Sequence, residues 1–313
     1  MARSVSTQVR RTTTSPTAAR VLREVRTALD VVDLVPEHRA LADVGLVTEL
    51  ADVLYAAWWV ARPTPRATGP GSPASRPGVL EAARRSVVGT SERLVLAVTD
   101  AHVVTVPLRG GAPVLVDVDE VVRTSRPGST PAPGDLAHVL DGASHYEPDG
   151  WWWVHSSCRG EPPAAPVDRW YLHAAGLEHA AALLRVLLPE LTAAQVPFSL
   201  KAGPAEDRYD RADAVVVYAP RAETGALRDV LRRAAPLVAA HLRPVTPPTT
   251  DRVLPGVATA QDPGGGRSFG QVRCEQVARV AVARDPQRAW DDAALAAALG
   301  EVGVDVDHPG VTR

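Results

Sequence analysis

The chain has 313 residues, 45% of them hydrophobic, and a formal net charge of −2 at pH 7. It is long enough for two modest domains or one large one, and its balanced charges argue against bulk nucleic-acid binding. Cys158 and Cys274 are too few for a disulfide framework and fit no metal-ligand spacing, so we expect a reducing, cytoplasmic setting. No apolar run is long enough to span a membrane.

The first half of the chain predicts helices followed by strands. Residues 1–16 are basic and rich in Ser and Thr without an apolar core, so we expect a disordered tail rather than a secretion signal. Apolar residues recur at helical spacing over 17–61, before a stretch rich in Pro, Gly and Ser. Three short β-like runs follow, at 94–99, 102–106 and 113–118. We therefore expect residues 17–145 to form an N-terminal domain with helices and a small antiparallel sheet.

The second half, residues 146–313, alternates strands with helices. Strand-like runs lie at 151–155, 169–173, 196–201 and 214–218. Helical patterns lie at 177–191 and 223–242, and a third helix is entered through Ser268 as its N-cap, after the loop DPGGG. Because the connections are irregular, the pattern favours an α+β fold over a doubly wound parallel sheet.

Lys201 is the only lysine, so the other 33 of the 34 basic residues are arginines, and isoleucine and asparagine are absent. This usage indicates a GC-rich genome, in which a tolerant basic position drifts to arginine. An arginine keeps its proton in a protein, whereas a lysine amine can be made neutral by burial and nearby cations. Lys201 is therefore a candidate general base, and the alternative is a chance survivor on a solvated surface. Six of the eight Lys, Phe and Tyr residues lie between Tyr171 and Phe269, which suggests that constraint is concentrated there.

Several reactive groups surround Lys201 in this window. Tyr171 and His173 share one face of their predicted strand, because strand side chains repeat every two residues. Arg208, Arg211 and Tyr218 follow Lys201, and the helix that begins at Ser268 combines backbone N–H groups with Arg273 one turn in. A lysine that can be neutral, a histidine, several arginines and an anion-binding helix start suggest proton abstraction next to a carbonyl, with a phosphate leaving.

Each of these groups also has an ordinary structural interpretation. A lone His173 is more often a hydrogen-bonded core residue than a catalyst. Arg208 and Arg211 would usually be solvated or paired with neighbouring aspartates. The glycines at 264–266 do not form a nucleotide-binding loop, because no Lys-Ser/Thr pair follows them.

Three runs carry a resemblance to a known family: VPFSLKAGPAEDRYDRADAVVVYAPR, HLRP, and LPGVATAQDPGGGRSFGQVRCEQVA. Together they resemble the HopA-type (type III effector-like) proteins of actinobacteria, which occur in biosynthetic clusters for class V lanthipeptides and thioamitides. The resemblance covers roughly residues 145–313. It implies a phospholyase-like catalytic domain at 146–313 and a carbon–oxygen lyase that eliminates phosphate from phosphoserine or phosphothreonine. The products are dehydroalanine and dehydrobutyrine.

The resemblance also implies roles for single residues. Lys201 matches the lysine that removes the α-proton, and His173 matches the histidine that protonates the departing phosphate. Arg211 and Arg273 match the two phosphate-gripping arginines, and Tyr218 matches a tyrosine of the following strand. The remaining candidates are Arg208 for phosphate binding, and Tyr171, Tyr209 and Ser268 as auxiliary groups. Tyr171 stands where pathogen phosphothreonine lyases carry a lysine, and the sequence after Lys201 lacks the Asn-Asp pair of many relatives.

The implied partners are a phosphorylated precursor peptide with a leader and a separate Ser/Thr kinase, with no metal, organic cofactor, nucleic acid or membrane. The N-terminal domain would contact the leader or the kinase. Two alternatives stay open: a phosphothreonine lyase that acts on a folded protein, and a non-catalytic subunit that carries the precursor peptide for a kinase. The complete set of Lys201, His173, Arg211 and Arg273 argues against the non-catalytic subunit, which would lose some of these residues.

Overall fold

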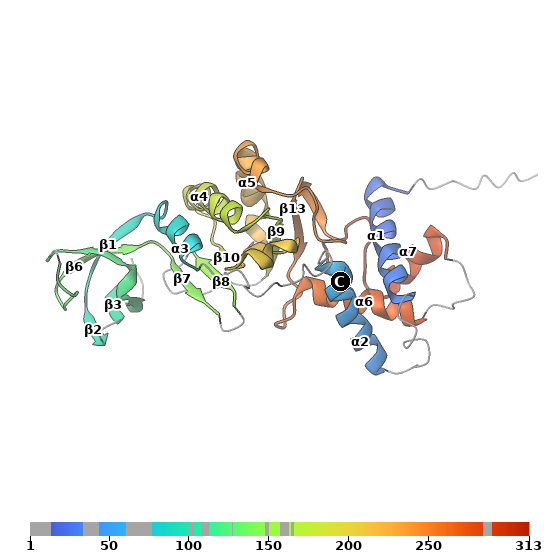
Figure 1. Ribbon diagram of the computed structural model, residues 1–313, viewed down its shortest axis with the longest axis horizontal. Coiled ribbons are helices and arrows are strands. Elements are labelled where there is room, and N and C mark those ends of the chain that lie inside the picture. The colour runs from blue at the N-terminus through green and yellow to red at the C-terminus, as the bar shows by residue number, and fades with distance from the viewer. Residues whose placement is uncertain are drawn as a thin grey trace, which may run out of the picture.

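The computed structural model describes residues 14–33, 44–60, 77–100, 103–107, 113–126, 128–147, 150–156, 163, 166–283 and 290–312. Most of the expected N-terminal tail, Cys158 and most of the Pro/Gly/Ser stretch after the first helices lie outside these residues. Within them the molecule is elongated, with a small β module at one end, a central sheet, and a group of helices at the other end (Figure 1).

The centre of the molecule is a seven-stranded antiparallel sheet with the order β12-β13-β9-β11-β10-β8-β7. Its strands are β7 (Ala143–Tyr146), β8 (Trp152–His155), β9 (Val167–Leu172), β10 (Ser199–Ala202), β11 (Val215–Pro220), β12 (Asp251–Leu254) and β13 (Val257–Gln261). Helices α4 (Leu177–Ala193) and α5 (Thr224–Val238) lie over one face of this sheet (Figure 1). The expected α+β class is confirmed.

The two faces of the sheet bury different sets of side chains because strand residues alternate. Leu200, Val217 and Trp170 point toward α4 and α5 and belong to the largest apolar core. Their sequence neighbours on the opposite face include Val216 and Tyr171, which pack in a second core with helices from both ends of the chain.

The second core joins the N-terminal helices to the C-terminal ones. Its helical elements are α1 (Pro16–Asp33), α2 (Val44–Leu54), the π-helical turn η2 (Tyr55–Trp59), α6 (Phe269–Ala283) and α7 (Asp292–Glu301). Helix α2 lies directly against α6. Trp59 packs on Tyr171 and Phe269, with ring centroids 6.3 and 5.6 Å apart. The first helices therefore cover a face of the central sheet.

A separate β module lies beyond strand β7. It contains β1 (Thr90–Leu94), β2 (Ala97–Asp100), β3 (Val103–Pro107), β4 (Pro113–Asp117), β5 (Val121–Thr124) and β6 (Leu136–Leu140), arranged as two three-stranded antiparallel sheets around a small core of its own. Helix α3 (Pro77–Arg85) packs against α4 beside the module. Residues 17–145, expected as one domain, thus contribute to three cores: α1, α2 and η2 to the second core, α3 to the largest core, and the β strands to the core of the module.

The contact between η2 and α6 gives a stability prediction. A Cβ atom added to Gly270 would lie 2.3 Å from Nε1 of Trp59, so Gly270→Ala must displace a buried indole. We expect Gly270→Ala to lower the free energy of unfolding by about 1–3 kcal/mol, the usual cost of overpacking. Gly225→Ala in α5, which meets nothing within 4 Å, is the matched control and should cause no loss. Urea unfolding of both variants measures the difference, and equal stabilities would contradict this packing.

Candidate functional site

Lys201 lies in β10, near the centre of the sheet, on the face turned away from α4 and α5. Its cross-strand neighbours are Trp153 on β8 and Val216 on β11, and Tyr171 of β9 is the next residue in the same row. The adjacent row on this face contains His155, Ser199, Tyr218 and Arg169. The face around Lys201 is therefore aromatic and cationic, whereas the opposite face belongs to the largest apolar core.

Three cations surround the indole ring of Trp151, just before β8. The Lys201 Nζ atom lies 4.4 Å from the centre of this ring, and the Cζ atoms of Arg211 and Arg208 lie at 5.3 and 5.7 Å. A cation within about 6 Å of a tryptophan face is attracted by the ring quadrupole. The structure thus brings together three of the predicted site residues, Lys201, Arg208 and Arg211, around a tryptophan that was not among them.

Arg211 is fixed by two further contacts. Its Nε and Nη2 donate to Asp213 at 2.6 and 2.8 Å, and Nη2 also donates to the hydroxyl of Tyr55 at 3.3 Å. Burial alone would lower the pKa of Arg211, but the hydrogen bonds and charge of Asp213 raise it above its ordinary value. Arg211 therefore remains charged and oriented.

Tyrosine hydroxyls from three elements surround this group. Burial raises the pKa of Tyr218 and of Tyr171 above the ordinary value, and it does the same for Tyr55. All three phenols therefore stay neutral and can donate hydrogen bonds. The guanidinium of Arg169, a residue not expected at the site, lies 5.1 Å from the centre of the Tyr218 ring and pairs with Asp262 at 2.6 Å.

His173 follows β9 and is buried. Its Nδ1 lies 3.0 Å from the carbonyl oxygen of Val245, which fixes Nδ1 as the protonated nitrogen, while Nε2 is buried and has no hydrogen-bond partner among the described residues. Burial lowers the pKa of His173, and the hydrogen bond to Val245 only partly opposes this effect. The resting imidazole is therefore neutral, which is the protonation state of a base rather than of an acid.

The other expected residues lie in more structural settings. Arg273 is 1% exposed, and its Nη2 donates to the carbonyls of Pro309 and Val311, so its contacts are with the C-terminal segment rather than with Trp151. Burial lowers the pKa of Arg273 to about 10. Tyr209 donates to the carbonyl of Gly203 at 2.5 Å and so secures the turn that carries Arg208.

Ser268 caps helix α6 as predicted. Its hydroxyl accepts from the backbone N–H of Gln271 at 3.1 Å, and the Gln271 side chain accepts from the Ser268 N–H at 2.7 Å. These reciprocal bonds form a capping box. Ser268 also hydrogen-bonds to Tyr55, which brings the start of α6 to the same group of residues as Arg211.

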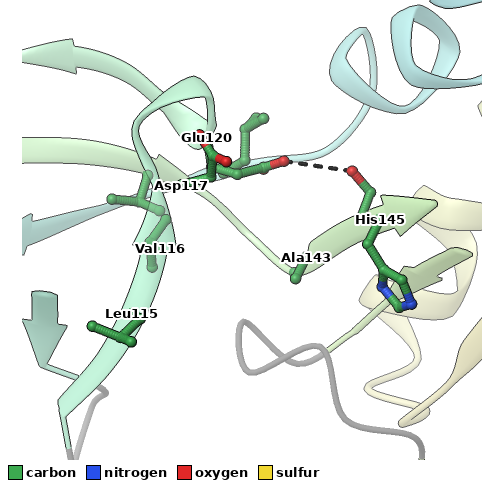
Figure 2. Close-up of a pocket in the computed structure, with 10 residues that line it drawn as sticks. Leu115, Val116, Asp117, Glu120, Ala143 and His145 are labelled. Carbon is green, nitrogen blue, oxygen red and sulfur yellow. Dashed lines mark hydrogen bonds between the residues drawn. The ribbon is translucent and has the colours of Figure 1, made fainter. Parts of the chain in front are cut away.

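A pocket of about 250 Å³ lies at the other edge of the sheet, between β4 and β7 (Figure 2). Asp117 and Glu120 contribute carboxylates to it, and Ser144 donates to Glu120 at 3.4 Å. Its acidic lining opposes phosphate binding. The cationic face around Trp151 is therefore the better anion site, and this pocket is a separate feature of the β module.

The described residues contain no group of three or more His, Cys, Asp or Glu side chains placed to hold a metal ion. None of the helices in the described part of the chain is both long and apolar enough to cross a membrane.

A family model described as the HopA1 effector protein family matches residues 153–311, slightly more than half of the chain. The chain belongs to the HopA1 effector protein family. The match includes Lys201, Arg208 and Arg211 and excludes Tyr55 and Trp151. No functionally curated protein matches the sequence.

Two solved structures of Pseudomonas syringae effector proteins resemble this HopA1 family member. The effector of pathovar tomato strain DC3000 is 12% identical, with a TM-score of 0.53 over 96% of this chain and 100% of the other. The effector of pathovar syringae strain 61 is also 12% identical, with a TM-score of 0.48 over 94% of this chain and 98% of that one. The likeness to the DC3000 effector shows that the fold is shared.

The buried histidines give a pH prediction. We expect His173 to titrate below 6.5, and the pKa of His155 to fall to about 4 through burial and the nearby His145. The unfolded chain then binds more protons below pH 6.5, so stability should fall as the pH is lowered from there, and these two histidines should add no pH dependence well above it. NMR titration of the imidazoles and urea unfolding at several pH values measure both effects. Titration of His173 at or above 6.5 would contradict the prediction. His173 could then carry the proton that a general acid needs before the substrate binds.

Proposed function

We propose that this HopA1 family member is a phosphoserine and phosphothreonine lyase that acts on a ribosomally made precursor peptide, in lanthipeptide or thioamitide biosynthesis. The observation that supports this best is the group formed by Lys201, Arg208 and Arg211 around Trp151. It combines the only lysine of the chain with two guanidinium groups of fixed charge. The substrate would be a phosphorylated peptide with a leader, supplied by a separate kinase in the cytoplasm.

The proposed reaction is a β-elimination. The neutral amine of Lys201 takes the α-proton, the released electron pair forms the Cα=Cβ double bond, and the bond from Cβ to the phosphate oxygen breaks. The phosphate leaves with the electron pair of the broken Cβ–O bond. Arg208 and Arg211 would bind its oxygens with charge-assisted hydrogen bonds and disperse the charge that develops as it departs. The products are a dehydrated residue and inorganic phosphate, with no redox step.

The two arginines also act on the base. Positive charges near an amine favour its neutral form, so Arg208 and Arg211 would promote loss of the Lys201 proton before the substrate arrives. A bound phosphate dianion then compensates their charge. The same residues would thus prepare the base and hold the leaving group.

The departing phosphate needs either a proton donor or compensation of its charge. His173 is proposed as the general acid, yet it would first have to gain a proton at the buried Nε2, which its lowered pKa opposes. Tyr218 is neutral and next to Trp153, with ring centroids 5.3 Å apart, and is the second candidate. A phosphate dianion can also leave without full protonation, since the arginines already compensate its charge.

The base assignment gives the first test. Lys201→Arg keeps the positive charge and removes the neutral form, so we expect phosphopeptide binding within about 3-fold of wild type and loss of elimination by at least ~10²-fold, the lower range for general acid–base catalysis. Mass spectrometry of a phosphorylated precursor would follow loss of phosphoric acid. Wild-type turnover by the arginine variant would exclude Lys201 as the base. A folded phosphoprotein in a parallel reaction tests whether a peptide is the preferred substrate.

Mutation of Arg211 and of Arg273, the two arginines first expected to bind phosphate, should have different effects. Arg211→Ala should weaken phosphopeptide binding by about 1.5–3 kcal/mol, the scale of a hydrogen bond to a charged group, with little effect on the unphosphorylated peptide. Arg273→Ala should mainly lower the free energy of unfolding, because it leaves the carbonyls of Pro309 and Val311 without a donor. Calorimetric titration and urea unfolding give the two quantities. Arg232→Ala, an exposed arginine of α5, controls for net charge. A selective binding loss in Arg273→Ala would assign it to the phosphate site.

A further inference from the structure

Tyr55 joins the N-terminal helices to the cationic group around Trp151. It is the first residue of η2, the π-helical turn that continues α2. Wide turns of this kind often occur where a helix carries a functional side chain. The last two residues of the turn, Trp58 and Trp59, are buried and anchor it in the second core. Tyr55 therefore projects from a firmly packed element.

The contacts of Tyr55 are polar and directional. Its hydroxyl accepts from Nη2 of Arg211 at 3.3 Å and hydrogen-bonds to Ser268, the N-cap of α6. Burial raises the pKa of Tyr55, so the hydroxyl stays neutral: its lone pair faces the guanidinium and its own proton is available to another acceptor. Tyr55 thus connects Arg211, on the segment after η4 (Glu206–Asp210), with the start of α6.

The hydrogen bond from Arg211 to Tyr55 matters because Asp213 alone holds only one edge of the Arg211 guanidinium. The bonds to Asp213 use Nε and Nη2, and the tyrosine shares Nη2. A planar guanidinium held from two directions points its remaining Nη1 edge along a fixed line. The Cζ atom of the same guanidinium lies 5.3 Å from the centre of the Trp151 ring, and the Nζ atom of Lys201 lies 4.4 Å from that centre.

We propose that Tyr55 is a positioning residue of the phosphate site: it holds Arg211 in the orientation that binds the leaving phosphate. The inference rests on the proposed lyase function. It also means that the N-terminal helical segment completes a site of which the family match over residues 153–311 contains Lys201, Arg208 and Arg211 but not Tyr55. A merely space-filling tyrosine would act through its ring, whereas this role belongs to the hydroxyl.

A double-mutant cycle tests the assignment. Tyr55→Phe keeps the ring and removes the hydroxyl, so we expect the Kd for a phosphoserine peptide to rise about 2- to 10-fold, the range of one net hydrogen bond, with KM for phosphate release rising in parallel. In the Arg211→Ala background the same change should have no further effect, because Tyr55 acts through Arg211. Trp58→Phe is the matched control in the same turn: it should lower the unfolding midpoint and leave the phosphopeptide Kd near that of wild type.

The outcomes separate the two proposals. A wild-type protein that releases no phosphate from the phosphopeptide overturns the lyase function and this inference with it. A wild type that releases phosphate while Tyr55→Phe binds and turns over equally well overturns this inference alone. An equal effect of Tyr55→Phe with and without Arg211 would also overturn it, because the hydroxyl would then contact the substrate directly. The inference is supported if Tyr55→Phe raises the phosphopeptide Kd when Arg211 is present and has no effect in the Arg211→Ala variant.

Discussion

The positive ends of Lys201, Arg208 and Arg211 gather around one indole ring, and their mutual repulsion must be offset for the folded state to persist. Three partners do this in the structure: the face of Trp151, the carboxylate of Asp213 and the hydroxyl of Tyr55. Asp213 supplies a negative charge, the Trp151 ring attracts the cations through its face, and the Tyr55 hydroxyl accepts one hydrogen bond. Under the proposed function, a phosphate dianion would reduce the repulsion among the three cations further. Clustered cations of this kind are typical of anion sites.

The central sheet makes this arrangement feasible because its two faces have different roles. One face is closed by α4 and α5 over the largest apolar core. On the other face, the described residues of α2, η2 and α6 pack over β9, β11 and β13, and Trp153 and Lys201 lie beside them on β8 and β10. The alternation of strand residues thus separates the largest core from the face that carries the proposed site.

Much of this could be predicted from the sequence where the signal was local. The strands at 152–155, 199–202 and 215–220 and helices α4, α5 and α6 carry clear periodicity and were expected close to their observed bounds. The hairpin of β12 and β13 was missed, because Val257–Gln261 alternates small residues whose burial depends on neighbouring strands. Helix α7 was missed as well: it is rich in alanine, has little sidedness, and is signalled mainly by its cap, Asp291.

The candidate site shows the same division between local and distant signals. Lys201, Arg208 and Arg211 lie within eleven residues of sequence, so one strand and one turn bring them together. Tyr55 is 156 residues from Arg211, and no periodicity reports a contact over that separation. Arg169 was overlooked because a strand arginine is ordinarily solvated, whereas here Asp262 and Tyr218 enclose it.

The positions of Lys, Phe and Tyr, whose codons are rich in A and T, give a weaker signal for site residues that lie far apart in the sequence. Lys201, Tyr171 and Tyr218 lie on one face of the sheet, and Tyr55 lies near both tyrosines, although it is outside the window where such residues concentrate. In a chain that replaces lysine by arginine almost everywhere, hydroxyl-bearing rings and the one amine persist where a hydroxyl or an exchangeable proton is needed. Tyr209 shows the limit of that signal, since its hydroxyl secures a turn and its retention is structural. What separates the two cases is the hydrogen-bond partner: the Tyr209 hydroxyl donates to a backbone carbonyl, whereas the Tyr55 hydroxyl accepts from the guanidinium of Arg211.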